Sequence, residues 1–168
     1  MGLDMYLEID RYVSAYSDAD KPALTKLNEG IGTLVESDIP TLDSRDSVSV
    51  TKGVGYWRKA NAIHNWFVEN VQGGVDECQR SFVDPEVLAE LRDLCRELID
   101  LFVDESTREI ALQEAEEKLP VAAGFFFGGQ EYDGYYWDDV KETAEFLEQF
   151  LEWHKDNRMW SIYYQSSW

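Results

Sequence analysis

The segment from Asp84 to Asp104 constrains the fold of this chain more than any other. Its apolar residues recur at intervals of three and four, with acidic residues between them: Val87, Leu88, Leu91, Leu94, Cys95, Leu98, Leu101 and Phe102. This spacing places them on one side of an α-helix. Asp84 is a favourable N-cap, and Pro85 suits the first helical position, where a missing N–H costs nothing. The segment therefore predicts an amphipathic helix that packs one side against a core.

Strands are predicted on both sides of this helix in the sequence. From Leu3 to Tyr12, apolar and polar residues alternate with the two-residue period of a strand that has one buried face. A β-branched alternation begins at Ser47 and leads toward Trp57. The run VAAGFFFGG predicts a buried strand at residues 122–127, and alternation in the tail RMWSIYYQSSW predicts another strand.

Further helices are predicted near Pro22, from Tyr56, over IALQEAEEKLP and from Asp138. The first of these is expected to end at Gly30 and Gly32. Both long helical and short irregular segments separate the strands, which favours a mixed or mainly antiparallel sheet with helices packed on one face. The length is typical of one domain. We therefore expect an α+β fold in which residues 1–168 form a single globular domain.

The chain is strongly acidic, with a formal charge of −19 over 168 residues. Most of this charge lies between Asp84 and Glu152, where 20 acidic residues accompany 5 basic ones. A negative field of this size repels phosphate backbones, so direct nucleic-acid binding is not expected. An acidic face most often provides solubility, and imitation of nucleic acid is the alternative.

Cys78 and Cys95 are the only cysteines, so they cannot form the usual four-ligand zinc site. Cys95 is expected to be a small buried residue and Cys78 a free thiol, while a disulfide between them is left open. The sequence shows no signal peptide, and its longest apolar run is too short to cross a bilayer. We expect a cytoplasmic protein with no membrane contact, no metal and no cofactor.

The block GYWRKANAIHNWFVENV, residues 55–71, is the densest candidate site. On a helical wheel most of its apolar residues share one side with His64, and Asn61 lies near the edge of that side. One interpretation is a core histidine whose ring nitrogens are hydrogen-bonded, with Asn61 in reach. The other is a pocket floor where His64 transfers a proton or binds a ligand. No nucleophile motif or metal-ligand spacing accompanies it.

Trp66 falls on the opposite side of the wheel, near Arg58 and Lys59. An aromatic ring beside two cations suits a planar ligand that carries phosphates or carboxylates, such as a nucleotide. The alternative is that the fold covers Trp66 and that the cations pair with the acidic helices. The candidate ligand-binding residues of this block are Trp57, Arg58, Asn61, His64 and Trp66.

A second dense segment, GFFFGGQEYDGYYWDD, includes the end of the strand predicted at residues 122–127. Its glycines permit tight turns, and Tyr132, Asp133 and Tyr135 place hydroxyls and a carboxylate beside them. The segment lacks the lysine and hydroxyl residue of a P-loop and the spacing of a dinucleotide fingerprint. The pattern therefore favours a loop that lines a ligand pocket over a phosphate cradle.

The start MGLDMYL, the block YWRKANAIHNWFVENVQ and the segments GFFFGG and YDGYYWDD resemble an uncharacterised family of small proteins from bacteriophages and bacterial genomes. The resemblance implies a phage or prophage origin and an accessory role on host factors in the host cell cytoplasm. It implies no particular activity, cofactor or catalytic residue.

Three hypotheses of different classes follow. The leading one is a binding protein that acts on a host protein or sequesters a small nucleotide-like ligand, for instance to counter host defence. The second is a small enzyme that uses His64 as an acid or base with Asp133 or another carboxylate. The third is an acidic structural or nucleic-acid-mimicking protein. The missing catalytic motif favours binding over catalysis, and a homo-oligomer is left open.

Overall fold

The computed structural model describes residues 2–35, 46–124 and 128–168. The chain divides into two compact units, a larger one of Met1–Ile9 with Gly53–Trp168 and a smaller one of Asp10–Lys52. Strands β1 and β2 each contribute residues to both units. The prediction that the whole chain forms one domain stays a prediction.

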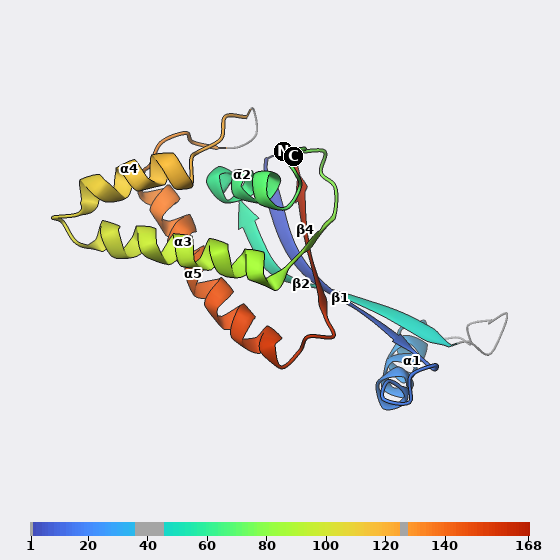
Figure 1. Cartoon of the computed structure of the whole chain (residues 1–168). Helices are drawn as coiled ribbons and strands as arrows, with labels where there is room; N and C mark the ends of the chain where they lie inside the picture. The colour runs from blue at the N-terminus through green and yellow to red at the C-terminus, as the bar shows by residue number, and fades with distance from the viewer. Residues whose placement is uncertain (1, 36–45, 125–127) are drawn as a thin grey trace. The chain divides into compact units, whose positions relative to one another are not determined.

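Four strands form an antiparallel sheet in the order β2-β1-β4-β3 (Figure 1). Their bounds are β1 Asp4–Ser14, β2 Ser47–Arg58, β3 Ser81–Val83 and β4 Ser161–Ser167. In the β3–β4 pair, Ser81 lies opposite Tyr164 and Val83 opposite Ile162. The α+β fold class predicted from the sequence is therefore confirmed.

Helices of the larger unit cover one face of its sheet (Figure 1). They are α2 Asn61–Asn70, α3 Pro85–Val103, α4 Arg108–Lys118 and α5 Gly134–Lys155. The predicted alternation of β1 explains this arrangement, because Leu3, Met5 and Leu7 are fully buried in the core while Tyr6 is exposed. The sheet thus has one face in the core, and Tyr6 on its other face is exposed.

The amphipathic helix predicted after Asp84 is confirmed as α3. Asp84 caps it by accepting a hydrogen bond from the Glu86 N–H at 3.1 Å, with Pro85 in the first turn. The core side of α3 consists of Leu88, Leu91, Cys95 and Leu98. A cap and a four-residue apolar stripe are together enough to fix where this helix begins and how it packs.

The helix predicted from Tyr56 begins later than expected, because β2 continues to Arg58 and α2 begins at Asn61. Tyr56 and Arg58 are exposed while Trp57 between them is buried, which is the alternation of a strand. The chain then turns at Lys59, whose φ of 62° lies in the left-handed region. The prediction was wrong because Tyr56, Trp57 and Arg58 are too few residues to distinguish the period of a helix from that of a strand.

The strand predicted at residues 122–127 is wrong for its described part, which has no regular secondary structure, and residues 125–127 lie outside the described residues. The Ala122 N–H donates to Asn61 Oδ1 at 3.0 Å instead of joining a sheet ladder. The sheet takes its short edge strand from Ser81–Val83 instead. Three residues are too few to show a period, so the sequence analysis missed this strand.

The smaller unit contains α1, Lys21–Val35, and parts of β1 and β2. Arg11 donates to the buried Asp20 carboxylate at 2.7 Å and fixes the chain just before α1. The helix passes through Gly30 and Gly32, where the sequence predicts its end. A glycine inside a helix costs about 1 kcal/mol relative to alanine, which weakens the helix without ending it.

Both cysteines are free thiols, so the disulfide that the sequence left open is not formed. Burial raises the pKa of the Cys95 thiol to about 12 and agrees with its place on the core side of α3. Cys78 is half-buried. Within the described part of the chain, no helix is long and apolar enough to cross a lipid bilayer.

Candidate functional site

A pocket of about 490 Å³, here called the α2 pocket, lies in the larger unit. Three segments form it: the junction of β2 and α2, the chain that follows α4, and the first turns of α5. It brings charged, amide and tyrosine groups together with apolar ones, and its size is typical of small-molecule sites. The lining residues are Arg58, Lys59, Ala60, Asn61, Ala62, Ile63, Val121, Gly128, Gly129, Glu131, Asp133, Tyr135, Tyr136, Asp139 and Val140.

The turn at Lys59 shapes one wall of the α2 pocket. The Lys59 N–H donates to the Leu3 carbonyl at 2.8 Å, and the Asn61 N–H donates to the Lys59 carbonyl at 2.8 Å. A left-handed conformation in a residue other than glycine stores strain of roughly 1–2 kcal/mol. Among the described residues, no side chain caps the first turn of α2, whose N-cap is Ala60. The wall therefore includes the first turn of α2, where N–H groups have no carbonyl partner within the helix.

Asn61 is the polar side chain that holds this wall in place. It is only 5% exposed, and its Nδ2 donates to the Gly129 carbonyl at 2.7 Å. Its Oδ1 accepts from the Ala122 N–H at 3.0 Å. One amide thus ties two backbone segments to the start of α2, and the shape of the pocket is built into the fold.

Gly128 occupies a position that only glycine fits. Its φ is 93°, and a Cβ there would lie 3.1 Å from Lys59 Cβ and 3.3 Å from the Lys59 carbonyl oxygen. We expect Gly128→Ala to lower the free energy of unfolding by roughly 1–3 kcal/mol, measured by urea denaturation. The matched control is Gly129→Ala, where no described atom lies within 4 Å of the added Cβ. Equal losses at both positions would contradict this account.

The start of α5 forms the acidic wall of the α2 pocket. Asp133 caps this helix, because its Oδ1 accepts from the N–H groups of Tyr135 at 3.0 Å and Tyr136 at 3.2 Å. Asp139 lies farther along α5 and is half-buried. Burial, together with the neighbouring carboxylates of Glu142, Asp138 and Asp133, raises the pKa of the Asp139 carboxyl to about 7. This carboxyl therefore gains and loses its proton near neutral pH.

His64 lies in a buried hydrogen-bonded chain and is not among the residues that line the α2 pocket. Its Nε2 is 3.0 Å from Asp76 Oδ2, and its Nδ1 is 2.7 Å from the Tyr164 hydroxyl. A carboxylate only accepts, so Nε2 donates to Asp76, and Nδ1 shares the second hydrogen bond of the ring with the Tyr164 hydroxyl. Burial raises the pKa of Tyr164 and keeps this hydroxyl protonated. The chain continues to Trp168, whose indole N–H donates to Asp76 at 3.2 Å.

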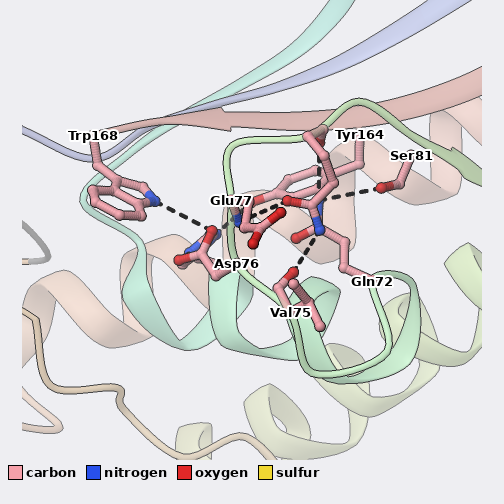
Figure 2. Close-up of polar contacts among 9 residues, drawn as sticks. Gln72, Val75, Asp76, Glu77, Ser81, Tyr164 and Trp168 are labelled. Atoms are coloured by element: carbon pink, nitrogen blue, oxygen red, sulfur yellow. Dashed lines mark hydrogen bonds and ion pairs between the residues drawn. The ribbon is translucent and has the colours of Figure 1, made fainter.

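The segment after α2 is held by further polar contacts, which Figure 2 shows around Asp76 and Gln72. Gln72 Nε2 donates to the Gln79 carbonyl at 3.1 Å and to Ser81 Oγ at 3.4 Å. Gln165 of β4 donates to the Cys78 carbonyl at 3.1 Å. These bonds attach an irregular segment to β3 and β4, so the His64 chain belongs to the architecture of the larger unit.

Both tryptophans of the candidate site are core residues. Trp57 is 7% exposed, and its indole N–H donates to Thr143 Oγ1 at 2.9 Å. Trp66 is 8% exposed and packs edge-on against Phe67, with ring centroids 5.4 Å apart. Of the two interpretations of Trp66, the structure agrees with the one in which the fold covers this residue, because α2 is buried on nearly all sides from Asn61 to Val68. A helical wheel assumes that one side of the helix faces the core, so it does not show that a helix is buried on nearly all sides.

The remaining predicted residues lie at or near the α2 pocket. Arg58 lines it, with its Nε 3.9 Å from Asp4 Oδ1 on β1, so its acidic neighbour is a strand residue and not a helix. Tyr135 lines it with 81% of the residue exposed. Tyr132 is half-buried behind the wall, where its hydroxyl accepts from the Val121 N–H at 3.4 Å. The structure thus brings Arg58, Asn61, Asp133 and Tyr135 together around one pocket.

Asp139 is the site residue that the sequence analysis missed. The helix was expected from Asp138, whereas it begins at Gly134 after the Asp133 cap. With the correct start, Asp139 follows Tyr135 and Tyr136 at spacings of four and three, which place side chains on one face. The signal was therefore the Asp133 cap, since an aspartate before a glycine suits a helix start as well as a turn.

The described residues contain no group of three or more histidine, cysteine, aspartate or glutamate side chains arranged to hold a metal ion. The lining of the α2 pocket instead includes three carboxyl residues, two cationic residues and the Asn61 amide. Comparisons of the chain with protein-family models, with curated proteins and with solved structures found no match. The site is therefore interpreted from its own residues alone.

Proposed function

We propose that this protein acts by binding a small polar ligand in the α2 pocket. The observation that carries the proposal is a pocket of about 490 Å³ whose wall is fixed by the buried Asn61 amide. A wall that is already ordered lowers the entropy cost of binding, because fewer groups must be immobilised when the ligand enters. Polar groups at fixed positions in such a pocket also set the orientation of a ligand.

The charged and aromatic groups around the α2 pocket have separate parts in this proposal. Arg58 and Lys59 offer positive charge to an anionic group of the ligand, at the wall where the first N–H groups of α2 lie. Tyr135, which is largely exposed, can pack its ring on the bound molecule. Asp139 faces the same pocket from α5. Complementary charge on different walls suits a ligand of defined polarity.

The resemblance to small phage proteins supports an accessory role in a host cytoplasm, in which the protein acts through what it binds. Sequestering a small molecule needs no catalytic group. A purely structural or nucleic-acid-mimicking role has less support, because it gives no reason for a pocket with fixed polar walls.

Catalysis by His64 also has less support. The residue is 1% exposed, and Tyr164 and Asp76 occupy both of its ring nitrogens. A general acid or base must reach the proton that it moves, within hydrogen-bond distance or through one water. His64 lies outside the lining of the α2 pocket, where a substrate would bind.

A protein partner is the second candidate function, and exposed aromatic side chains on the sheet support it. Tyr6 and Tyr56 are 38% and 57% exposed, with ring centroids 5.5 Å apart. Phe82, also 57% exposed, packs edge-on against Tyr163 at 5.9 Å. Exposed aromatic side chains are enriched where proteins meet other proteins. These side chains become the leading site if the α2 pocket binds nothing.

The α2 pocket can be filled without disturbing its walls by Gly129→Leu. Gly129 lines the pocket, and no described atom lies within 4 Å of the position of an added Cβ. We expect a ligand at 100 times its Kd to raise the Tm of the unmodified protein by roughly 5–10 °C. The variant should lose this shift, measured by thermal denaturation with nucleotides, cyclic nucleotides, amino acids and polyamines.

The matched control is Gly53→Leu, a glycine in β2 where an added Cβ also meets no described atom within 4 Å. This variant carries the same substitution outside the pocket and should keep the ligand-induced shift. Both variants should unfold within about 0.5 kcal/mol of the unmodified protein when no ligand is present. A ligand that protects all three proteins equally would bind elsewhere and would refute the proposal.

A further inference from the structure

Asp139 is the half-buried acidic residue of the α2 pocket whose carboxylate has no partner among the described residues. It is half-buried in the wall, and within the described parts of the chain no hydrogen bond or ion pair holds it. Its main chain is engaged, because the Asp139 carbonyl accepts from Thr143 Oγ1 at 2.6 Å. A partly desolvated carboxylate without a donor is costly, and a positively charged group of a ligand would lower this cost.

The neighbouring charges define what that partner must be. Asp138 and Glu142 on α5 and Asp133 before it are all negative and oppose ionisation of Asp139. Asp133 itself is engaged as the cap of α5. A negatively charged group placed beside Asp139 would add to this repulsion, whereas a positively charged nitrogen would relieve it.

The positive side chains that line the same pocket belong to the β2–α2 junction. Arg58 and Lys59 lie there, and Glu131 adds a further carboxylate in the chain before α5. The two cations attract an anionic group, whereas Asp139 attracts a cationic one. The walls therefore match a molecule that carries both charges better than a nucleotide with phosphates alone.

We propose that Asp139 binds a positively charged nitrogen of the ligand, so that the α2 pocket takes small zwitterions of the amino-acid type, with their anionic group toward Arg58 and Lys59. This inference rests on the proposed function and adds the chemical class of the ligand. Asp139 acts as a binding residue in it and has no catalytic part.

The inference predicts a pH dependence of known sign. Asp139 must be ionised to bind an ammonium group, and its pKa of about 7 in the free protein means that ionisation rises between pH 6 and pH 8. The affinity for lysine, arginine or 4-aminobutanoate should therefore increase about tenfold over this range, because the ionised fraction increases by that factor. Primary amines of the lysine type stay charged throughout, since their pKa is about 10.4.

Asp139→Asn keeps the shape of the side chain and removes its charge. Titration calorimetry should show weaker binding of the zwitterions by the variant at pH 8 and no rise in affinity from pH 6. N-acetylation of 4-aminobutanoate, which neutralises its nitrogen, should abolish binding to the unmodified protein. Putrescine and AMP, which lack the anionic and the cationic half respectively, should bind more weakly than the zwitterions.

A measurement without ligand checks the fold of the variant. The folded state raises the pKa of Asp139, so ionisation destabilises the unmodified protein as pH rises from about 4 to 7. Asp139→Asn should thus gain urea resistance relative to the unmodified protein at pH 8 and little at pH 4. A variant less stable than the unmodified protein at pH 8 would contradict a partnerless carboxylate.

The outcomes separate the two proposals. Binding of AMP that Gly129→Leu abolishes and Asp139→Asn leaves unchanged, with no zwitterion bound, would overturn the role of Asp139 and keep the pocket. Failure of every zwitterion, amine and nucleotide to bind the unmodified protein would overturn both. Equal binding of 4-aminobutanoate and its N-acetyl form would overturn the proposal that Asp139 binds the charged nitrogen of the ligand.

Discussion

Replacing His64 with alanine should lower the free energy of unfolding by roughly 3–5 kcal/mol and leave ligand binding in the α2 pocket unchanged. The substitution opens a cavity in the core and strands the Tyr164 hydroxyl and the Asp76 carboxylate, which lie 2.7 and 3.0 Å from the ring nitrogens. Chemical denaturation gives the loss of stability. Calorimetry with any ligand found for the pocket, below the unfolding transition, gives the binding.

His154 provides an internal control for the His64 prediction. It is also buried, at 7% exposure, but among the described residues its ring has one hydrogen bond, from Nε2 to the Trp160 carbonyl at 2.9 Å. His154→Ala should therefore cost less than His64→Ala. A double-mutant cycle with Tyr164→Phe should show a coupling of at least about 0.5 kcal/mol with His64. Lost ligand binding in a His64 variant that remains folded would place the residue in the functional site after all.

The second large effect is expected at Leu91, on the core side of α3. Leu91 is fully buried, so Leu91→Ala should cost roughly 2–5 kcal/mol, because the surrounding helices cannot fully close the cavity. Leu94 lies on the same helix but is only half-buried, and Leu94→Ala should cost about half as much or less. Urea denaturation of the two variants tests the ranking. A larger loss at Leu94 would show that the stripe packs differently from the structure.

The parts of the fold that the sequence predicts are those in which one period runs over many residues. The stripe of α3 repeats over five turns and the alternation of β1 over four pairs, so each excludes the competing period. The β2–α2 junction shows the limit of this reasoning. Its boundary depends on the left-handed Lys59, and lysine gives no sequence signal for such a conformation.

The candidate site was predicted in part, for physical reasons that differ between residues. Asn61 and Tyr135 were found because polar and aromatic side chains cluster in two segments, and these segments do meet at one pocket. His64 and Trp66 were drawn into the same site because a wheel describes one helix and not what surrounds it. Their true contacts, with Tyr164 and Phe67 among others, depend on tertiary packing that local patterns do not contain.

The strand order has a consequence for how the chain is made. β4 lies between β1 and β3 in the sheet, although it follows both of them and β2 in the sequence and is synthesised after them. Before β4 is synthesised, β1 has one neighbouring strand in the sheet and β3 has none. His64 also lacks its hydrogen-bond partner Tyr164, which lies 100 residues later in the sequence. Contacts between such distant residues slow folding. The larger unit therefore completes its sheet only when synthesis has passed β4, and the apolar face of β1 is open to chaperones in the interval.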